Sequence, residues 1–165
     1  MSTENLSNEK AKEKFESLVN DIKVCMMITN LSGRPLSAVP MSHKKVDNEG
    51  NIWFLTGNDS DHIFDIKRDS GCQLIFSDSK SKFLSAYGEA KIILDQKLVH
   101  EFYCGADNAY FDGKDDPRLV TVKFIPEQAA YWSSQENRIV TLFKLGIAAI
   151  TGKKQDLRNS GKMEL

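Results

Sequence analysis

The chain has 165 residues, a length that suits one domain with its own hydrophobic core. Hydrophobic residues make up 41% of it, which is ordinary for a globular protein and excludes a disordered or fibrous chain. Its 22 basic and 23 acidic side chains nearly cancel, so no net positive field would attract nucleic acid.

The sequence shows no targeting or membrane signal. Residues 1–16 are polar and charged, without the apolar core of a signal peptide. No segment approaches the roughly 20 apolar residues of a membrane-spanning helix. The cysteines, Cys25, Cys72 and Cys104, are odd in number and lack CxxC spacing, which favours reduced thiols. We therefore expect a cytoplasmic protein without a metal site and without membrane or nucleic-acid partners.

One helix and three strands are expected in the first third of the chain. Apolar residues recur at helical spacing over 8–21, directly after Ser7, which can cap the helix. Short runs rich in strand-forming residues follow at 24–31, 36–42 and 51–56. A Ser-Gly pair and an Asp-Asn-Glu-Gly turn separate these runs, which predicts hairpins.

The remaining elements alternate between short helices and strands. We expect a helix at 62–69, followed by strands at 73–77 and 83–94 and by a helix capped by Asp95. After an irregular stretch at 105–117, we expect a strand at 119–125 that Pro126 ends, and then a helix at 138–150. Gly88 lies inside the strand expected at 83–94. A glycine within a strand typically marks a bulge or a sharp bend.

This order of elements predicts a mainly β fold with flanking helices. It has no βαβ alternation, which argues against a doubly wound parallel sheet. About six strands with hairpin turns favour a small antiparallel barrel whose ends are covered by helices. We expect a single domain over residues 1–152 and a polar C-terminal tail over 153–165.

No familiar catalytic motif is present, but two segments have features of a ligand site. At 53–66 a strand runs directly into a helix, and free N–H groups with nearby hydroxyls at a helix start can bind a phosphate. Simple capping by Asp59 or Ser60 is the plainer alternative. In the segment 37–41, Pro40 has no backbone N–H to donate to a neighbouring strand. We therefore expect Pro40 at the edge of the sheet, beside a bulge or against a ligand. An ordinary edge strand is the alternative there.

Two later segments are also candidates. In 129–138, Trp132 could stack on a ring system and Arg138 could reach an anion, although Trp132 could equally be a core or dimer contact. In 109–124, acidic residues form turns and could attract a cation. A solvated acidic loop is the more ordinary interpretation of that segment.

Taken together, these segments resemble the general stress protein branch of the pyridoxamine 5′-phosphate oxidase-like flavin-binding split barrels. The resemblance runs from Phe15 to about Gly152, and the order and spacing of its pieces make it specific. The residues that match are 33–41, 50–67, 83–95, 109–132 and 142–154.

The resemblance implies a six-stranded split barrel that forms a homodimer, with one FMN in each of two clefts built by both subunits. The backbone of Val39, Pro40 and Met41 would face the isoalloxazine ring. The ribityl phosphate would be held by the positions that match Leu55, Thr56, Ser60 and His62. Trp132 would reach the ring from the partner subunit.

The chain departs from the family pattern at the positions that bind phosphate. Family members often have an arginine where this chain has Ala38-Val39, and basic residues where it has Asp61 and His62. Each lost charge-assisted bond is worth roughly 1.5–3 kcal/mol. Compensation could come from His62 itself or from nearby lysines, which are Lys44, Lys45 and Lys67.

The residues that the true oxidases use for substrate are only partly present. Their pattern has an arginine and a histidine two residues apart, and here Arg138 matches the first while Val140 replaces the second. The lysine that would grip the substrate phosphate is replaced by His43. We therefore do not expect pyridoxamine phosphate oxidation.

Three functions are consistent with these residues. The first is an FMN-binding stress protein that exchanges electrons with an unidentified small molecule, because a flavin supplies redox chemistry without a catalytic triad. The second is a module that stores or senses flavin without turnover. The third is a dimeric scaffold that has lost the cofactor.

Overall fold

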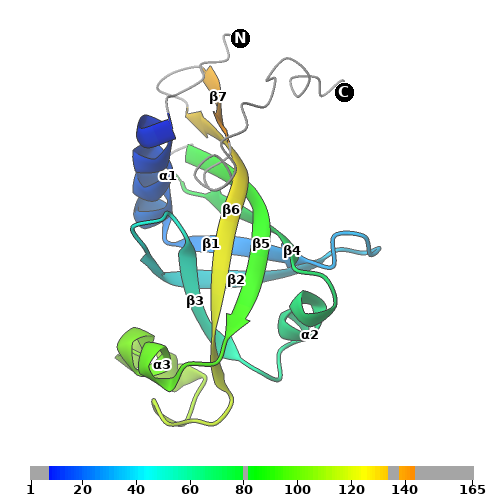
Figure 1. Ribbon diagram of the computed structural model, residues 1–165, viewed down its shortest axis with the longest axis vertical. Helices are drawn as coiled ribbons and strands as arrows, with labels where there is room; N and C mark the ends of the chain where they lie inside the picture. Colours follow the sequence, from blue (N-terminus) through cyan, green and yellow to red (C-terminus); the bar gives the residue numbers. More distant parts are fainter. Residues whose placement is uncertain (1–7, 80–81, 134–137, 144–165) are drawn as a thin grey trace.

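The chain folds around a curved antiparallel sheet (Figure 1). The computed structural model describes residues 8–79, 82–133 and 138–143. Its elements in chain order are α1 (Asn8–Ile22), β1 (Val24–Thr29), β2 (Ser37–Val46), β3 (Ile52–Gly57), α2 (Asp61–Arg68), β4 (Gly71–Ser77), β5 (Lys82–Ile93), α3 (Gln96–Phe102), the short 3-10 helix η1 (Gly105–Ala109), β6 (Leu119–Ser133) and β7 (Arg138–Phe143).

Six strands of the described chain close into a barrel. They lie in the order β3-β2-β1-β4-β5-β6, every pair is antiparallel, and a β3–β6 pair closes the ring. The seventh strand, β7, pairs with β6 and continues the sheet beyond the ring (Figure 1). The structure confirms the expected mainly β fold, a six-stranded antiparallel barrel with flanking helices.

The alternation of side chains along the strands fills the barrel. Successive residues of a strand point to opposite faces, so every second residue faces the interior. In β1 these are Cys25 and Met27, and in β4 Leu74 and Phe76, all at most 2% exposed. Residues from β3, β5 and β6 complete the core, among them Phe54, Leu84 and Phe124.

Helices cover the barrel much as the sequence predicts. The apolar face of α1 buries Phe15 and Val19 in the core, and the helix spans one residue more than the expected 8–21. Its expected cap, Ser7, lies outside the described residues. The Asp95 side chain caps α3 by accepting a hydrogen bond from the Lys97 N–H at 2.9 Å. No helix in the described ranges is long and apolar enough to cross a membrane.

The bend in β5 confirms the prediction made from Gly88. The β5–β6 register shifts between Tyr87 and Gly88, and a Cβ on Gly88 would lie 2.0 Å from the Ile125 carbonyl oxygen. Only a glycine allows the strands to approach so closely. The prediction that Pro126 ends the next strand is wrong, because β6 continues to Ser133. Pro126 lies at the register shift, opposite Gly88, where an irregular ladder tolerates its missing N–H.

The expected helix over 138–150 is also wrong where it can be checked. Residues 138–143 form β7, which pairs with β6 from Gln128 to Ser133. The apolar residues of this segment are consistent with a helix or with a strand. The segment forms a strand because the free edge of β6 provides backbone partners for it. Residues 144–150 and the expected tail at 153–165 lie outside the described residues.

Candidate functional site

The barrel is open along half of β2. Residues 37–42 pair with β1, whereas β3 pairs with β2 only from His43 to Val46. Their second edge therefore meets no described strand, which confirms that Pro40 lies at an edge. Val39 and Met41 pack against the core, while Pro40 is exposed on the outer face. Free backbone groups along such an edge need a partner from outside the sheet.

The strand-to-helix segment brings two of the four predicted phosphate-binding residues into contact. The Thr56 hydroxyl at the end of β3 lies 2.9 Å from His62 Nε2 in the first turn of α2. His62 is only 5% exposed, and burial lowers its pKa, although Asp61 and Asp65 partly oppose the shift. His62 is therefore a neutral hydrogen-bonding group at pH 7. Leu55, the fourth residue of this set, instead packs beneath α3 with Val99.

Ser60 occupies the cap position of α2 without capping it through its side chain. Its carbonyl accepts the Ile63 N–H at 3.0 Å, but its hydroxyl makes no capping hydrogen bond. Asp59 folds back instead, and its Oδ1 lies 2.6 Å from where a Cβ on Gly57 would stand. The alternative of side-chain capping by Asp59 or Ser60 is thus not what the structure shows. A helix start with free N–H groups and a hydroxyl is suited to bind an anion.

A buried carboxylate near this helix start was missed by sequence analysis. Asp65 Oδ2 accepts a hydrogen bond from the Thr29 hydroxyl at 2.9 Å, and its Oδ1 accepts one from Arg68 at 2.8 Å. Burial alone would raise the pKa of Asp65, but these hydrogen bonds outweigh it and lower the pKa. The only signal in the sequence was an acid on the buried face of the predicted helix, three residues after His62.

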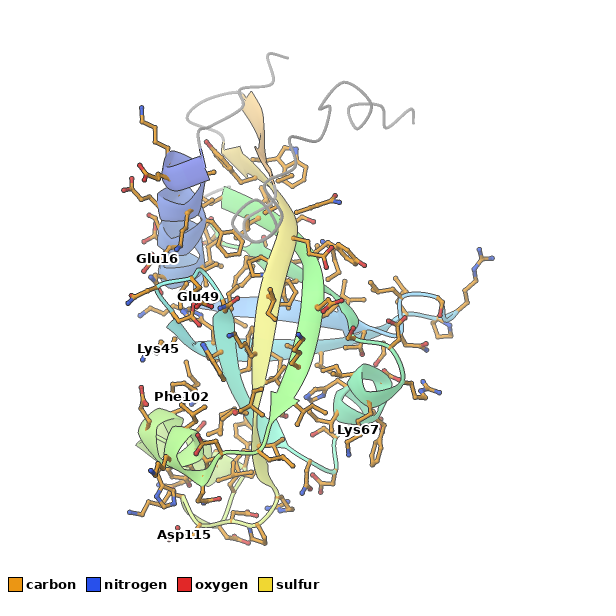
Figure 2. The ribbon with its side chains drawn as sticks, in the orientation of Figure 1. Glu16, Lys45, Glu49, Lys67, Phe102 and Asp115 are labelled. Carbon is orange, nitrogen blue, oxygen red and sulfur yellow. The ribbon has the colours of Figure 1, made fainter. Side chains whose placement is uncertain are left out.

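The lysines that could have supplied positive charge to the helix start make other contacts. Lys44 forms an ion pair with Asp107 at 2.7 Å, and Lys45 forms one with Glu101 at 3.0 Å. Figure 2 shows Lys45 on the side of the barrel away from α2 and Lys67 on α2 itself. The Lys67 ammonium lies 5.4 Å from the centre of the Phe64 ring.

The outer face of the barrel presents apolar side chains to solvent. Val24 and Met26 on β1 are 48% and 40% exposed, and Phe83 on β5 is 43% exposed. Pro40 lies opposite Met26, and Trp132 lies opposite Phe83 on the same outer face. Large exposed apolar patches of this kind mark interaction surfaces.

Pro40 and Trp132 lie too far apart in one chain to contact the same ring. Through β1, β4 and β5 the strand order places four strand-to-strand steps between β2 and β6, which is about 19 Å at about 4.8 Å a step. Through β3 there are only two steps, but β3 pairs with β6 only from Leu119 to Phe124, and Trp132 lies a further eight residues along β6, about 26 Å at about 3.3 Å a residue. Trp132 could therefore meet a ring bound at Pro40 only if it came from a second copy of the chain.

The acidic loop before β6 is a structural element. Asp116 is buried and forms an ion pair with Arg118 at 2.7 Å, and hydrogen bonds from Arg118 and from the Asp112 and Arg118 N–H groups lower its pKa strongly. Within the described residues, no group of three His, Cys, Asp or Glu side chains is arranged to hold a metal ion. Asp116 therefore stabilises the loop from a buried position and is not one of the solvated acids that the sequence suggested.

Comparison with known proteins identifies the family. Residues 10–156 match the family described as pyridoxamine 5′-phosphate oxidase like. The chain belongs to this family. No curated protein matches it significantly.

Solved structures agree with this assignment of the fold. A Clostridium acetobutylicum protein related to general stress protein 26 superposes with a TM-score of 0.68 at 23% identity, over 84% of this chain and 96% of that one. General stress protein 26 of Bacillus anthracis gives 0.64 at 20% identity, over 73% and 92%. A general stress FMN/FAD binding protein of Xanthomonas citri gives 0.64 at 22% identity, over 76% and 89%.

Within this family fold, the two expected substrate residues are not brought to the helix start. The ring nitrogens of His43 lie 2.9 Å from the Lys23 carbonyl oxygen and 3.2 Å from Asn20 Oδ1, at the junction of α1 and β1. Burial lowers the pKa of His43, and the Lys23 carbonyl partly opposes this. The backbone of Arg138 begins β7, and its side chain lies outside the described residues. A substrate role for either residue stays a prediction.

We expect the stability of the protein to fall with acidification, in part through His62. Because burial lowers its pKa in the folded chain from the ordinary 6.5, the unfolded chain binds more protons below that pH. The stabilisation is therefore complete above 6.5 and is lost as the pH falls towards the folded pKa. The midpoint of thermal unfolding, measured between about pH 7.5 and about pH 5.5, should fall less in His62→Gln, whose side chain does not titrate. An equal fall in both proteins would contradict this assignment.

Proposed function

We propose that this protein binds FMN in clefts that two copies of the chain form together. The observation that supports this most is the open edge of β2 beside an uncapped helix start. The edge offers free backbone groups to the rim of a flat ring, and the helix start offers N–H groups to a phosphate. The Xanthomonas citri neighbour, described as an FMN/FAD binding protein, is consistent with such a ligand.

Different residues at the helix start would make different contacts with the phosphate. The Ser60 hydroxyl and the free N–H groups at the start of α2 would donate hydrogen bonds to the phosphate, while the Thr56 hydroxyl, 2.9 Å from Nε2, would orient the His62 ring. Neutral His62 contributes a hydrogen bond and no charge, and Asp59 and Asp61 lie close by. Because Lys44 and Lys45 are paired with other acids, hydrogen bonds and the helix dipole would provide most of the phosphate affinity that the described residues supply.

The second copy would complete the cleft and cover the apolar outer face. Val24, Met26 and Phe83 are exposed in the single chain, and burying apolar surface stabilises an interface by roughly 25 cal/mol per Å². The same contact would bring Trp132 of one copy towards the β2 edge of the other. We therefore propose a homodimer in which cofactor binding and association occur at one surface.

A bound flavin would supply the capacity to accept and donate electrons. The protein would bind and orient the ring along β2, and Trp132 would cover it from water. We propose an oxidoreductase acting on an unidentified small molecule, and not a pyridoxamine phosphate oxidase, because Val140 replaces the expected histidine.

A flavin carrier or sensor is the second candidate, and the pairing of Lys44 and Lys45 with acids away from the helix start favours it. Anaerobic reduction by a nicotinamide cofactor, followed by reoxidation with a quinone or nitro compound, would support the enzyme. Flavin that binds but is not reduced would support the carrier. Purified protein that stays colourless after incubation with FMN would leave only the scaffold.

The first prediction concerns His62. In His62→Lys, a permanent positive charge replaces a neutral ring, so we expect FMN to bind about tenfold more tightly. Riboflavin, which lacks the phosphate, should bind with unchanged affinity. Fluorescence titration with both ligands measures this, and unchanged or weaker FMN binding would remove His62 from the phosphate site.

The second prediction concerns Trp132. In Trp132→Ala, loss of the stacked indole should shift the visible absorption bands of bound FMN. The matched control is Trp53→Phe, because Trp53 donates a hydrogen bond to Asp47 at 2.9 Å and lies away from the proposed cleft. If the bound FMN has the same spectrum in Trp132→Ala as in the unmodified protein, Trp132 does not contact the ring and has only a structural role.

The third prediction concerns the dimer. Met26→Glu places a charge among the exposed apolar side chains of the outer face, so it should shift the protein from dimer to monomer in analytical ultracentrifugation and weaken FMN binding. Leu94→Glu is the control, because Leu94 is exposed but lies beyond the end of β5. A monomeric unmodified protein, or a dimer that survives Met26→Glu, would contradict the proposed interface.

A further inference from the structure

A buried carboxylate connects α2 to the end of the β1–β2 hairpin. Asp65 lies on the inner face of α2, and its Oδ2 accepts a hydrogen bond from Thr29, a fully buried residue of β1. The Ser37 side chain lies close enough to the carboxylate to lower the pKa of Asp65 further. Thr29 and Ser37 face each other as the last register pair between β1 and β2. We call this set of contacts the Asp65 link.

The Asp65 link keeps a charged group in a place where charge is costly. Arg68 stabilises the carboxylate at 2.8 Å, but its own side chain is 69% exposed, so the two hydroxyls provide the contacts on the inner side. A buried carboxylate is tolerated only when such hydrogen bonds satisfy it. Because hydrogen bonds to a charged group are strong and directional, they fix α2 against the hairpin more firmly than apolar packing alone.

The two ends of the Asp65 link lie beside the two halves of the proposed flavin site. Ser37 is two residues before Val39 on the open edge of β2, where the ring would bind. Asp65 is one helical turn after His62, where the phosphate would bind. The link therefore sets how far the helix start lies from the open edge.

We propose that Asp65 is a positioning residue that holds the phosphate subsite at the correct distance from the ring subsite. This inference rests on the proposed function. Its consequence is ligand selectivity: Asp65 makes the site prefer a phosphorylated flavin to riboflavin. When the two subsites are held in place beforehand, a ligand that contacts both binds without the cost of ordering them.

The charge of Asp65 acts in the opposite direction, which makes the inference testable. A carboxylate near the helix start repels a phosphate, so removing the charge alone should improve FMN binding. Removing the positional constraint should instead weaken FMN relative to riboflavin. The sign of the change in the FMN-to-riboflavin affinity ratio therefore separates the two effects.

The experiment measures the dissociation constants of FMN and riboflavin for the full chain and its Thr29 variants. Thr29→Val removes the hydrogen bond to Asp65 without changing the size or charge of the side chain. We therefore expect the ratio of FMN affinity to riboflavin affinity to fall about tenfold. Riboflavin affinity should change less than twofold. Thr29→Ser keeps the hydroxyl and should restore the ratio. Asp65→Asn should also lower the ratio if position dominates over charge.

Thr121→Val is the matched control. Thr121 is an equally buried threonine whose hydroxyl donates to the Ile93 carbonyl at 2.8 Å, away from α2. Its loss should leave the ratio unchanged. If Thr29→Val fails to fold, Ser37→Ala removes the other hydroxyl and gives the same test.

The outcomes distinguish the two proposals. An unmodified protein that binds neither flavin would overturn the proposed function, and this inference with it. Flavin binding with an unchanged ratio in Thr29→Val and Ser37→Ala would overturn the role of Asp65 alone. A ratio that rises in Asp65→Asn would show that charge, not position, is what Asp65 contributes.

Discussion

The incomplete pairing of β2 is the constraint on which the site depends. β3 pairs with β6 along its whole length, from Ile52 to Gly57, but with β2 only from His43 to Val46. The barrel therefore closes while residues 37–42 keep one free edge. Because backbone N–H and C=O groups need partners, this edge is where a ligand or a second chain is most favourably bound. Pro40 fits there since it has no N–H to leave unpaired.

The charged groups around the helix start decide how an anion could be held there. Burial keeps His62 neutral, Asp59 and Asp61 lie nearby, and Lys44 and Lys45 pair with other acids. An anion there would be held by hydrogen bonds and the helix dipole, whose contribution is smaller than that of a buried ion pair. Ring contacts and the second chain would then provide a larger share of the affinity than in a site with arginine or lysine.

In the proposed dimer, the outer face of the barrel would connect association with binding. Its exposed apolar residues would gain stability if a second copy covered them. Within one chain, Pro40 and Trp132 are four strand-to-strand steps apart through β1, β4 and β5, and the shorter route through β3 leaves them far apart along the strands. A site that needs both residues must therefore use two chains.

The sequence by itself determined the elements whose residues alternate or recur regularly, and it located Pro40, Gly88 and the strand-to-helix segment correctly. It could not place β7 or carry β6 past Pro126, because those outcomes depend on which strand edge lies opposite. It also missed Asp65, whose hydrogen bond to Thr29 joins residues 36 positions apart. Local periodicity reports which face of an element is buried, whereas the partner on that face is decided by register and closure of the barrel. Only the tertiary structure therefore brought the parts of the site together.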